Sequence, residues 1–156
     1  MASSLRSVEN ATMTDAHRDL VARLAVVPAR LAAAARAAAP HPPAAGEWAP
    51  SDVVRHLIAV EDEVWSARLA QLATEDHPRW PWTEPDRWAG EPDASLDRLL
   101  GRYAVARAST VATLDGLDED GWARTGTHAT FGELDVAALM GRAIDHDEEH
   151  LRSFAR

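Results

Sequence analysis

The sequence contains no cysteine. This absence excludes a disulfide framework, a thiolate metal site and a cysteine nucleophile, so any thiol chemistry needs a thiol from outside the chain. The sequence also contains no lysine, and all 16 of its Lys and Arg residues are arginine. Together with the abundance of alanine, this bias is typical of a GC-rich bacterial genome.

Basic residues are few compared with acidic ones. The chain has 25 Asp and Glu against 16 basic residues, for a formal net charge of -9. Such a chain lacks the basic face that nucleic-acid binding needs, so we expect no nucleic-acid partner. No apolar run approaches the ~20 residues of a membrane span, and no hydrophobic segment follows Arg6 as it would in a secretory signal. We therefore expect a cytoplasmic protein without a membrane partner.

The chain length of 156 residues is that of one domain with a proper core. Residues 1–13 are polar and aperiodic, which predicts a disordered leader. Residues 14–156 carry the helical periodicity and form the predicted single domain.

Apolar residues at spacings of three and four predict four amphipathic helices. The first runs for about 25 residues from an N-cap at Thr14, and the second runs from an N-cap at Ser51 to about residue 73. The third begins at Ser95 and stops at Gly116, and the fourth starts near Glu133 and continues to the chain end. We therefore expect an all-α protein, a four-helix bundle with long connections, and no strand beyond a short loop pair.

The connection over residues 74–94 is long for a plain loop, and it contains Trp80, Trp82 and Trp88 among prolines. Loops of this length are uncommon unless they cover something or move. Two interpretations stay open: the loop packs over the end of the bundle, or it walls a substrate pocket.

Two histidines, His146 and His150, stand four residues apart in the last predicted helix. This spacing stacks both imidazoles on one face, close enough to bind one metal ion. The best third ligand is His56, which lies at the edge of the apolar face of the second helix, as the pair does in the fourth. If these helices are antiparallel neighbours, all three side chains reach the same end of the bundle. Three neutral imidazoles suit a divalent ion, with zinc or nickel expected first, and leave open positions for water or substrate.

Two other metal patterns fit less well. Zincin proteases use His-Glu-x-x-His, but Asp147 takes the place of the glutamate and only six residues follow His150. Di-iron bundles need two Glu-x-x-His pairs, and neither His56 nor His146 has an acid three residues before it.

Glu61 and Asp147 interrupt the apolar faces of their helices. Buried charges need partners or a metal, so two alternatives stay open. One is an internal ion pair of either carboxylate with Arg68. The other is a carboxylate that orients an imidazole of the metal site or acts as a general base.

The remaining histidines give weaker signals. His17 falls in the first turn of the first helix, and His41 and His77 stand among prolines in connections, so we expect all three at the surface. His128 precedes the fourth helix. That its side chain reaches a pocket beside the metal site is the less favoured alternative.

Three motifs occur in order along the chain: Trp48-x-x-Ser51-x-x-x-x-His56-Leu57, His128-x-x-Phe131-Gly132 and His146-x-x-x-His150-Leu151. Their order and spacing resemble the DinB-like superfamily, over about residues 14 to 156. The resemblance implies a four-helix bundle that holds a divalent metal with three histidines, which map onto His56, His146 and His150. It also implies a homodimer, and transferase or isomerase reactions that use low-molecular-weight thiols such as mycothiol or bacillithiol.

The reaction itself stays open among three hypotheses, each with a small-molecule partner. The first is a thiol-dependent S-transferase, for which the GC-rich coding bias favours a mycothiol-type thiol. The second is a metal-dependent hydrolase on the same site, because a metal with an open position activates either a thiol or water. The third is a non-enzymatic metal- or ligand-binding stress protein.

Overall fold

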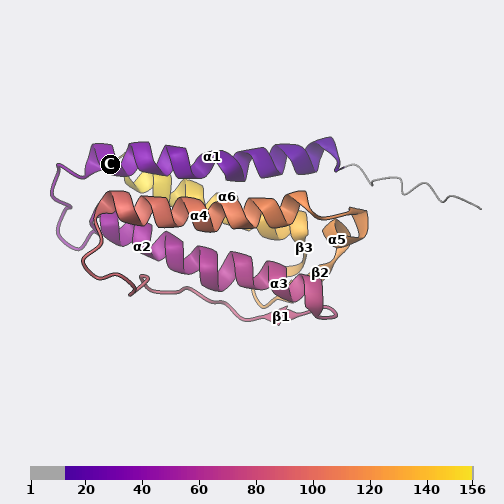
Figure 1. Ribbon diagram of the computed structural model, residues 1–156. Helices are drawn as coiled ribbons and strands as arrows, with labels where there is room; N and C mark the ends of the chain where they lie inside the picture. The colour runs from indigo at the N-terminus through magenta and orange to yellow at the C-terminus, as the bar shows by residue number, and fades with distance from the viewer. Residues whose placement is uncertain (1–12, 156) are drawn as a thin grey trace, which may run out of the picture.

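The computed structural model describes residues 13–155, so the predicted leader lies outside the described residues except for Met13. Four long helical segments lie side by side (Figure 1). They are α1 (Asp15–Ala38), a continuous segment of α2 (Pro50–Val60), η1 (Glu61–Ser66) and α3 (Ala67–Thr74), then α4 (Leu96–Asp115) and α6 (Val136–Ser153). The prediction of a four-helix bundle is confirmed.

The direction of the helices differs from a simple up-and-down bundle. The segment from α2 to α3 runs antiparallel to α1, but α4 runs in the same direction as α2–α3, and α6 returns antiparallel to both (Figure 1). The connection between α3 and α4 must therefore run the length of the bundle, which explains why this connection, residues 75–95, is long. The start of α2 and the end of α6 lie at the same end of the molecule.

Local sequence sets most helix starts. The caps predicted at Thr14 and Ser95 are present, and each side chain accepts the backbone N–H of the residue three positions on. The cap predicted at Ser51 is wrong, because the second helix already begins at Pro50. Proline has no N–H to satisfy and suits the first helical position, and Asp52 accepts the N–H of residue 49 at 3.3 Å.

The fourth helix begins at Val136, later than predicted, because Glu133 belongs to a strand. Strand β3 (Gly132–Asp135) pairs antiparallel with β2 (Thr125–His128), which pairs parallel with β1 (Arg79–Trp80). Strands of two to four residues are too short for an alternating pattern to reveal them. The sheet and the short helix α5 (Glu119–Ala123) lie at the end of the bundle where α1 begins (Figure 1).

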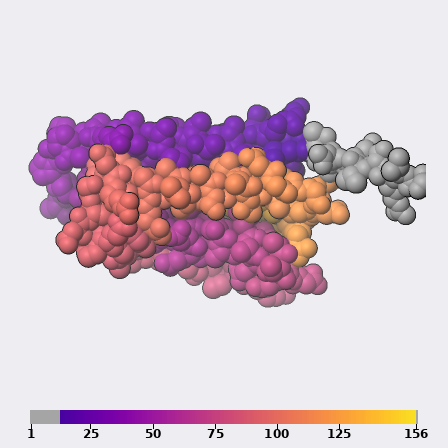
Figure 2. Space-filling model, viewed as in Figure 1, coloured from indigo at the N-terminus to yellow at the C-terminus, as the bar shows by residue number. Residues whose placement is uncertain are grey.

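The core fills the space between the long helices, and α1 and α4 form two neighbouring ridges along the outer face in Figure 2. Trp80 from the long connection is buried in this core, where its indole N–H donates to Gln71 at 2.9 Å. Trp88 packs against the core near the start of α4, whereas the residue Trp82 is 59% exposed. The connection therefore covers the bundle as expected, except at Trp82. Within the described residues, no helix has the length and apolar character to cross a membrane.

Candidate metal centre

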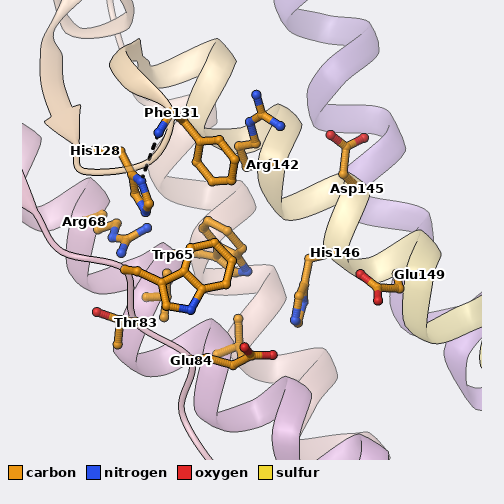
Figure 3. Close-up of a pocket in the computed structure, with 13 residues that line it drawn as sticks. Trp65, Arg68, Thr83, Glu84, His128, Phe131, Arg142, Asp145, His146 and Glu149 are labelled. Atoms are coloured by element: carbon orange, nitrogen blue, oxygen red, sulfur yellow. Dashed lines mark hydrogen bonds between the residues drawn. The ribbon is translucent and has the colours of Figure 1, made fainter.

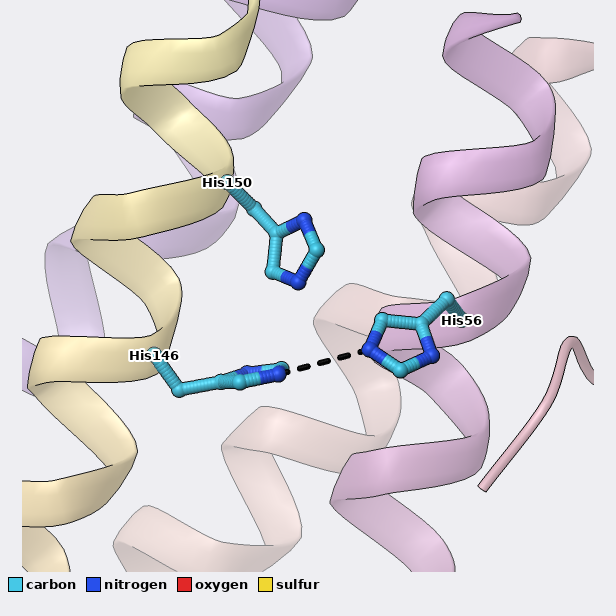
Figure 4. Close-up of side chains that lie close together, drawn as sticks. All are labelled: His56, His146 and His150. Carbon is cyan, nitrogen blue, oxygen red and sulfur yellow. Dashed lines mark hydrogen bonds between the residues drawn. The ribbon is translucent and has the colours of Figure 1, made fainter. Parts of the chain in front are cut away.

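His56 near the start of α2, and His146 and His150 near the end of α6, point toward one another (Figure 4). One ring nitrogen of each histidine lies within 4.8 Å of the corresponding nitrogens of the other two. The Nε2 atoms of His56 and His146 are 3.3 Å apart. The structure therefore brings together the three histidines selected from the sequence, and we call them the histidine cluster.

Hydrogen bonding selects the tautomer of His56. Its Nδ1 lies 2.9 Å from the carbonyl oxygen of Pro85, in the long connection, and a carbonyl only accepts. Nδ1 therefore carries the proton, and Nε2 presents its lone pair to His146. The Nδ1 of His146 is buried and has no hydrogen-bond partner among the described residues.

The spacing and protonation of the cluster fit a shared cation. Two nitrogens bound to a tetrahedral zinc ion at about 2.0–2.1 Å lie about 3.3–3.4 Å apart, which matches the separation of the His56 and His146 Nε2 atoms. Burial, together with the neighbouring imidazoles, lowers the pKa values of His146 and His150 to about 4. Both rings are therefore neutral at pH 7, with lone pairs free for a metal.

The carboxylates of Glu61 and Asp147 meet one arginine, Arg107 of α4, inside the bundle. Arg107 Nη2 lies 2.8 Å from Glu61 Oε2, and its Nη1 lies 2.9 Å from Asp147 Oδ2. Thr110 donates to Glu61 at 2.6 Å, and the hydroxyl of Tyr103 donates to Asp147 at 3.3 Å. We call these five residues the Arg107 network. Burial raises the pKa of Asp147 to about 6, although Arg107 acts in the opposite direction.

The network corrects the expected pairing. Neither Glu61 nor Asp147 pairs with Arg68, and none of the hydrogen bonds within residues 13–155 joins either carboxylate to an imidazole. The helical pattern places both acids inside the bundle, but it cannot tell which arginine of another helix faces them. The partner comes from α4, so the network joins residues of η1, α4 and α6 inside the bundle.

A cavity of about 390 Å³ opens beside His146 (Figure 3). Its chemically distinctive lining residues are Trp65, Arg68, Trp82, Glu84, His128, Phe131, Arg142, Asp145 and Glu149. Residues 82–84 belong to the long connection, so this loop forms part of the cavity wall, and it packs along the bundle and not only over its end. A second cavity of about 210 Å³ touches His150.

Two features of the cavity wall were not predicted from the sequence. The segment η1 is a π-helix, which is rare and frequent at functional sites. It carries Trp65, whose ring centroid lies 6.2 Å from that of His146. His128 is buried in the cavity wall, which was the less favoured alternative. Its Nδ1 accepts the backbone N–H groups of Thr130 and Phe131 at 3.0 and 3.3 Å, so the available signal was the tight turn that follows it.

The other three histidines lie outside the cluster. His41 is exposed, as expected. His17 stacks on Trp122 with ring centroids 4.0 Å apart, and His77 is hydrogen-bonded to Thr127 at 2.7 Å, so both are half-buried. The expectation of surface positions is therefore correct for His41 alone, because the other two find partners far away in the sequence.

The fold and the histidine cluster define a class of helical bundle in which α2 and α6 supply three converging imidazoles. The family model of the DinB superfamily matches residues 14–154, and the chain belongs to that superfamily. Among solved structures, the chain is similar to YfiT from Bacillus subtilis, described as "a probable metal-dependent hydrolase with an unusual four-helix bundle topology". The two chains are 20% identical, with a TM-score of 0.72, over 96% of this chain and 89% of YfiT. No curated protein matches at a significant level.

Proposed function

We propose that this protein is a divalent-metal-dependent enzyme and that His56, His146 and His150 hold the metal. The observation that carries the proposal is the convergence of one nitrogen from each ring within 4.8 Å. Neutral imidazoles suit zinc or nickel. A divalent ion on three neutral ligands keeps its full charge and lowers the pKa of a bound thiol or water.

The reaction that we propose is S-transfer from a low-molecular-weight, mycothiol-type thiol to a small electrophile. Two cavities support it, because the larger touches His146 and the smaller touches His150. A thiol and an electrophile each need a place beside the same centre. The chain has no cysteine, so the thiol must come from outside. Trp65 and Phe131 line the larger cavity and supply apolar surface against which an organic electrophile can pack.

Hydrolysis at the same centre is the second candidate. The description of YfiT as a probable metal-dependent hydrolase favours it. In this chain, Glu84, Asp145 and Glu149 line the larger cavity with His146 and are candidates for a general base.

Metal titration tests the centre first. Metal-stripped protein is titrated with zinc and nickel, and we expect one ion per chain. His56→Ala should lose the binding, and His41→Ala serves as the matched control because His41 is exposed and outside the cluster. Equal binding by both variants would contradict the proposed centre.

Turnover then separates the two reactions. Metal-loaded protein is given a panel of electrophiles with and without a thiol, and a panel of esters and amides without thiol. Metal-dependent thiol consumption supports the transferase, and thiol-independent hydrolysis supports the hydrolase. A metal-loaded protein that does neither across broad panels would overturn both and favour a binding protein.

A further inference from the structure

Arg68 is a buried cation without a buried anion. Its side chain lies in α3 with the residue only 7% exposed. No carboxylate of the described chain lies within ion-pair distance of it, and its one hydrogen bond runs from Nη2 to the carbonyl oxygen of Pro81 at 3.1 Å. Burial lowers the pKa of Arg68. Its guanidinium also lies 5.5 Å from the ring centre of Trp80, and within the described residues no Arg68 nitrogen is both fully buried and without a hydrogen-bond partner. Without a carboxylate partner, Arg68 keeps donors available for an anion from outside the described chain.

The free donors of Arg68 face the larger cavity. Arg68 lines that cavity together with Arg142 and His128. Figure 3 shows Arg68 and His128 on one side of it and His146 and Glu149 on the other. The guanidinium of Arg142 stacks 4.0 Å from the ring centre of Phe131, and within residues 13–155 no carboxylate forms an ion pair with it.

His128 adds a neutral donor to this side of the cavity. Its Nδ1 already accepts two backbone N–H groups, so the proton lies on Nε2. Burial, Arg68 and Arg142 all lower the pKa of His128, which keeps the ring neutral. Arg68 and His128 therefore lie together in the cavity wall, and the exposed Arg142 lines the cavity beside Phe131 (Figure 3).

We propose that Arg68, Arg142 and His128 form an anion subsite that binds a carboxylate of the substrate. The planar fork of Arg68 matches a carboxylate with two parallel hydrogen bonds. Trp65 and Phe131 supply apolar surface for the body of the molecule, and Glu84, Asp145 and Glu149 disfavour a second negative charge elsewhere in the cavity. The substrate class is thus a small organic monoacid with an apolar body. That its reactive end faces the histidine cluster rests on the proposed function; the anion subsite itself does not.

Ligand binding tests the subsite directly. Metal-loaded protein is titrated with benzoate and phenylacetate and with the matched neutral amides, benzamide and phenylacetamide, by calorimetry. We expect the acids to bind about tenfold to hundredfold more tightly than the amides, as hydrogen bonds to charged groups predict. Arg68→Gln should abolish the preference, and Arg142→Gln should reduce it by a smaller factor. Arg79→Gln removes the same charge from an exposed residue of β1 and should leave the preference unchanged.

The same samples separate this proposal from the metal centre. Metal content is measured for each variant, and Arg68→Gln should keep it. The preference for acids over amides is measured again in His150→Ala, in which the metal centre lacks one ligand. We expect the preference to persist in this variant. Loss of the preference there would assign carboxylate binding to the metal and overturn the subsite.

A wild-type protein that binds metal but binds acids and amides equally also overturns the subsite. A metal-free wild type with an Arg68-dependent preference overturns the proposed function alone. If Arg68→Gln does not fold, Arg142→Gln and Arg68→Lys decide, since an unchanged preference in both contradicts the subsite.

Discussion

Arg107 and Arg68 are both buried in the same bundle, yet their surroundings are opposite. Arg107 has two carboxylates as partners, and Tyr103 and Thr110 complete the hydrogen bonding around them. Arg68 has one carbonyl and faces a cavity. A closed polar network satisfies its own groups and holds helices together, whereas an open one leaves donors free for a ligand. We therefore expect the Arg107 network to contribute to stability and the cavity beside the histidine cluster to bind a ligand.

The largest effect should come from breaking the closed network. Arg107→Leu leaves Glu61 and Asp147 buried without their cation, and we expect a loss of about 3–5 kcal/mol in the free energy of unfolding. Urea denaturation measures it. Arg36→Leu is the control, because its pair with Asp97 is exposed and such pairs contribute at most about 1 kcal/mol. Equal losses of unfolding free energy in the two variants would contradict the expectation that the buried ion pairs of Arg107 contribute more than the exposed pair of Arg36.

Removing one imidazole should affect the open region without harming the bundle. His150→Ala is expected to weaken metal binding by more than about a hundredfold, since even the residues behind metal ligands contribute 10- to 100-fold. The far-ultraviolet circular dichroism should stay that of a helical protein, because His150 is half-buried at the end of α6. Unchanged metal affinity in competition with a chelator would contradict the ligand assignment.

Acid should act on the histidine cluster through its lowered pKa values. An unfolded histidine has a pKa of about 6.5, but His146 and His150 have about 4 in the folded protein. The unfolded state therefore binds more protons between these values, and the metal-free protein loses stability as the pH falls from about 6.5 to about 4. Each histidine should account for about 1–2 kcal/mol between pH 7 and pH 5.

Urea unfolding of metal-free protein at the two pH values measures this loss, and His150→Ala should show a smaller difference. The comparison with the variant is needed because the raised pKa of Asp147 acts in the opposite direction over the same range. A difference of the same size in wild type and variant would mean that these imidazoles are not the groups that titrate.

The smallest effect is expected outside both regions. His41→Ala and His77→Ala should change metal affinity by less than about twofold, because neither ring belongs to the cluster. His77→Ala removes hydrogen bonds to Thr125 and Thr127, so we expect a modest loss of stability in that variant alone. A tenfold loss of metal affinity in either variant would require a different ligand set.

Much of the candidate site could be predicted because helical spacing is a local property. His146 and His150 lie on one face whenever that segment is a helix. The same periodicity places His56 at the edge of its apolar face, but the folded protein leaves it only 2% exposed, with the long connection against its ring. The polar partners were not predictable in this way. The choice of Arg107 over Arg68 depends on which helices are neighbours and how far each is rotated about its axis.

The sequence by itself determined the amphipathic helices, the N-caps at Thr14 and Ser95, and a histidine pair one turn apart, since all of these depend on residues within a few positions of one another. Only the tertiary structure decided the direction of α4, the short sheet, and the tautomer of His56 set by Pro85. It also decided that Arg68 faces a cavity without a carboxylate. These features join residues that are distant in the sequence, and no local pattern encodes which distant groups meet when the core packs.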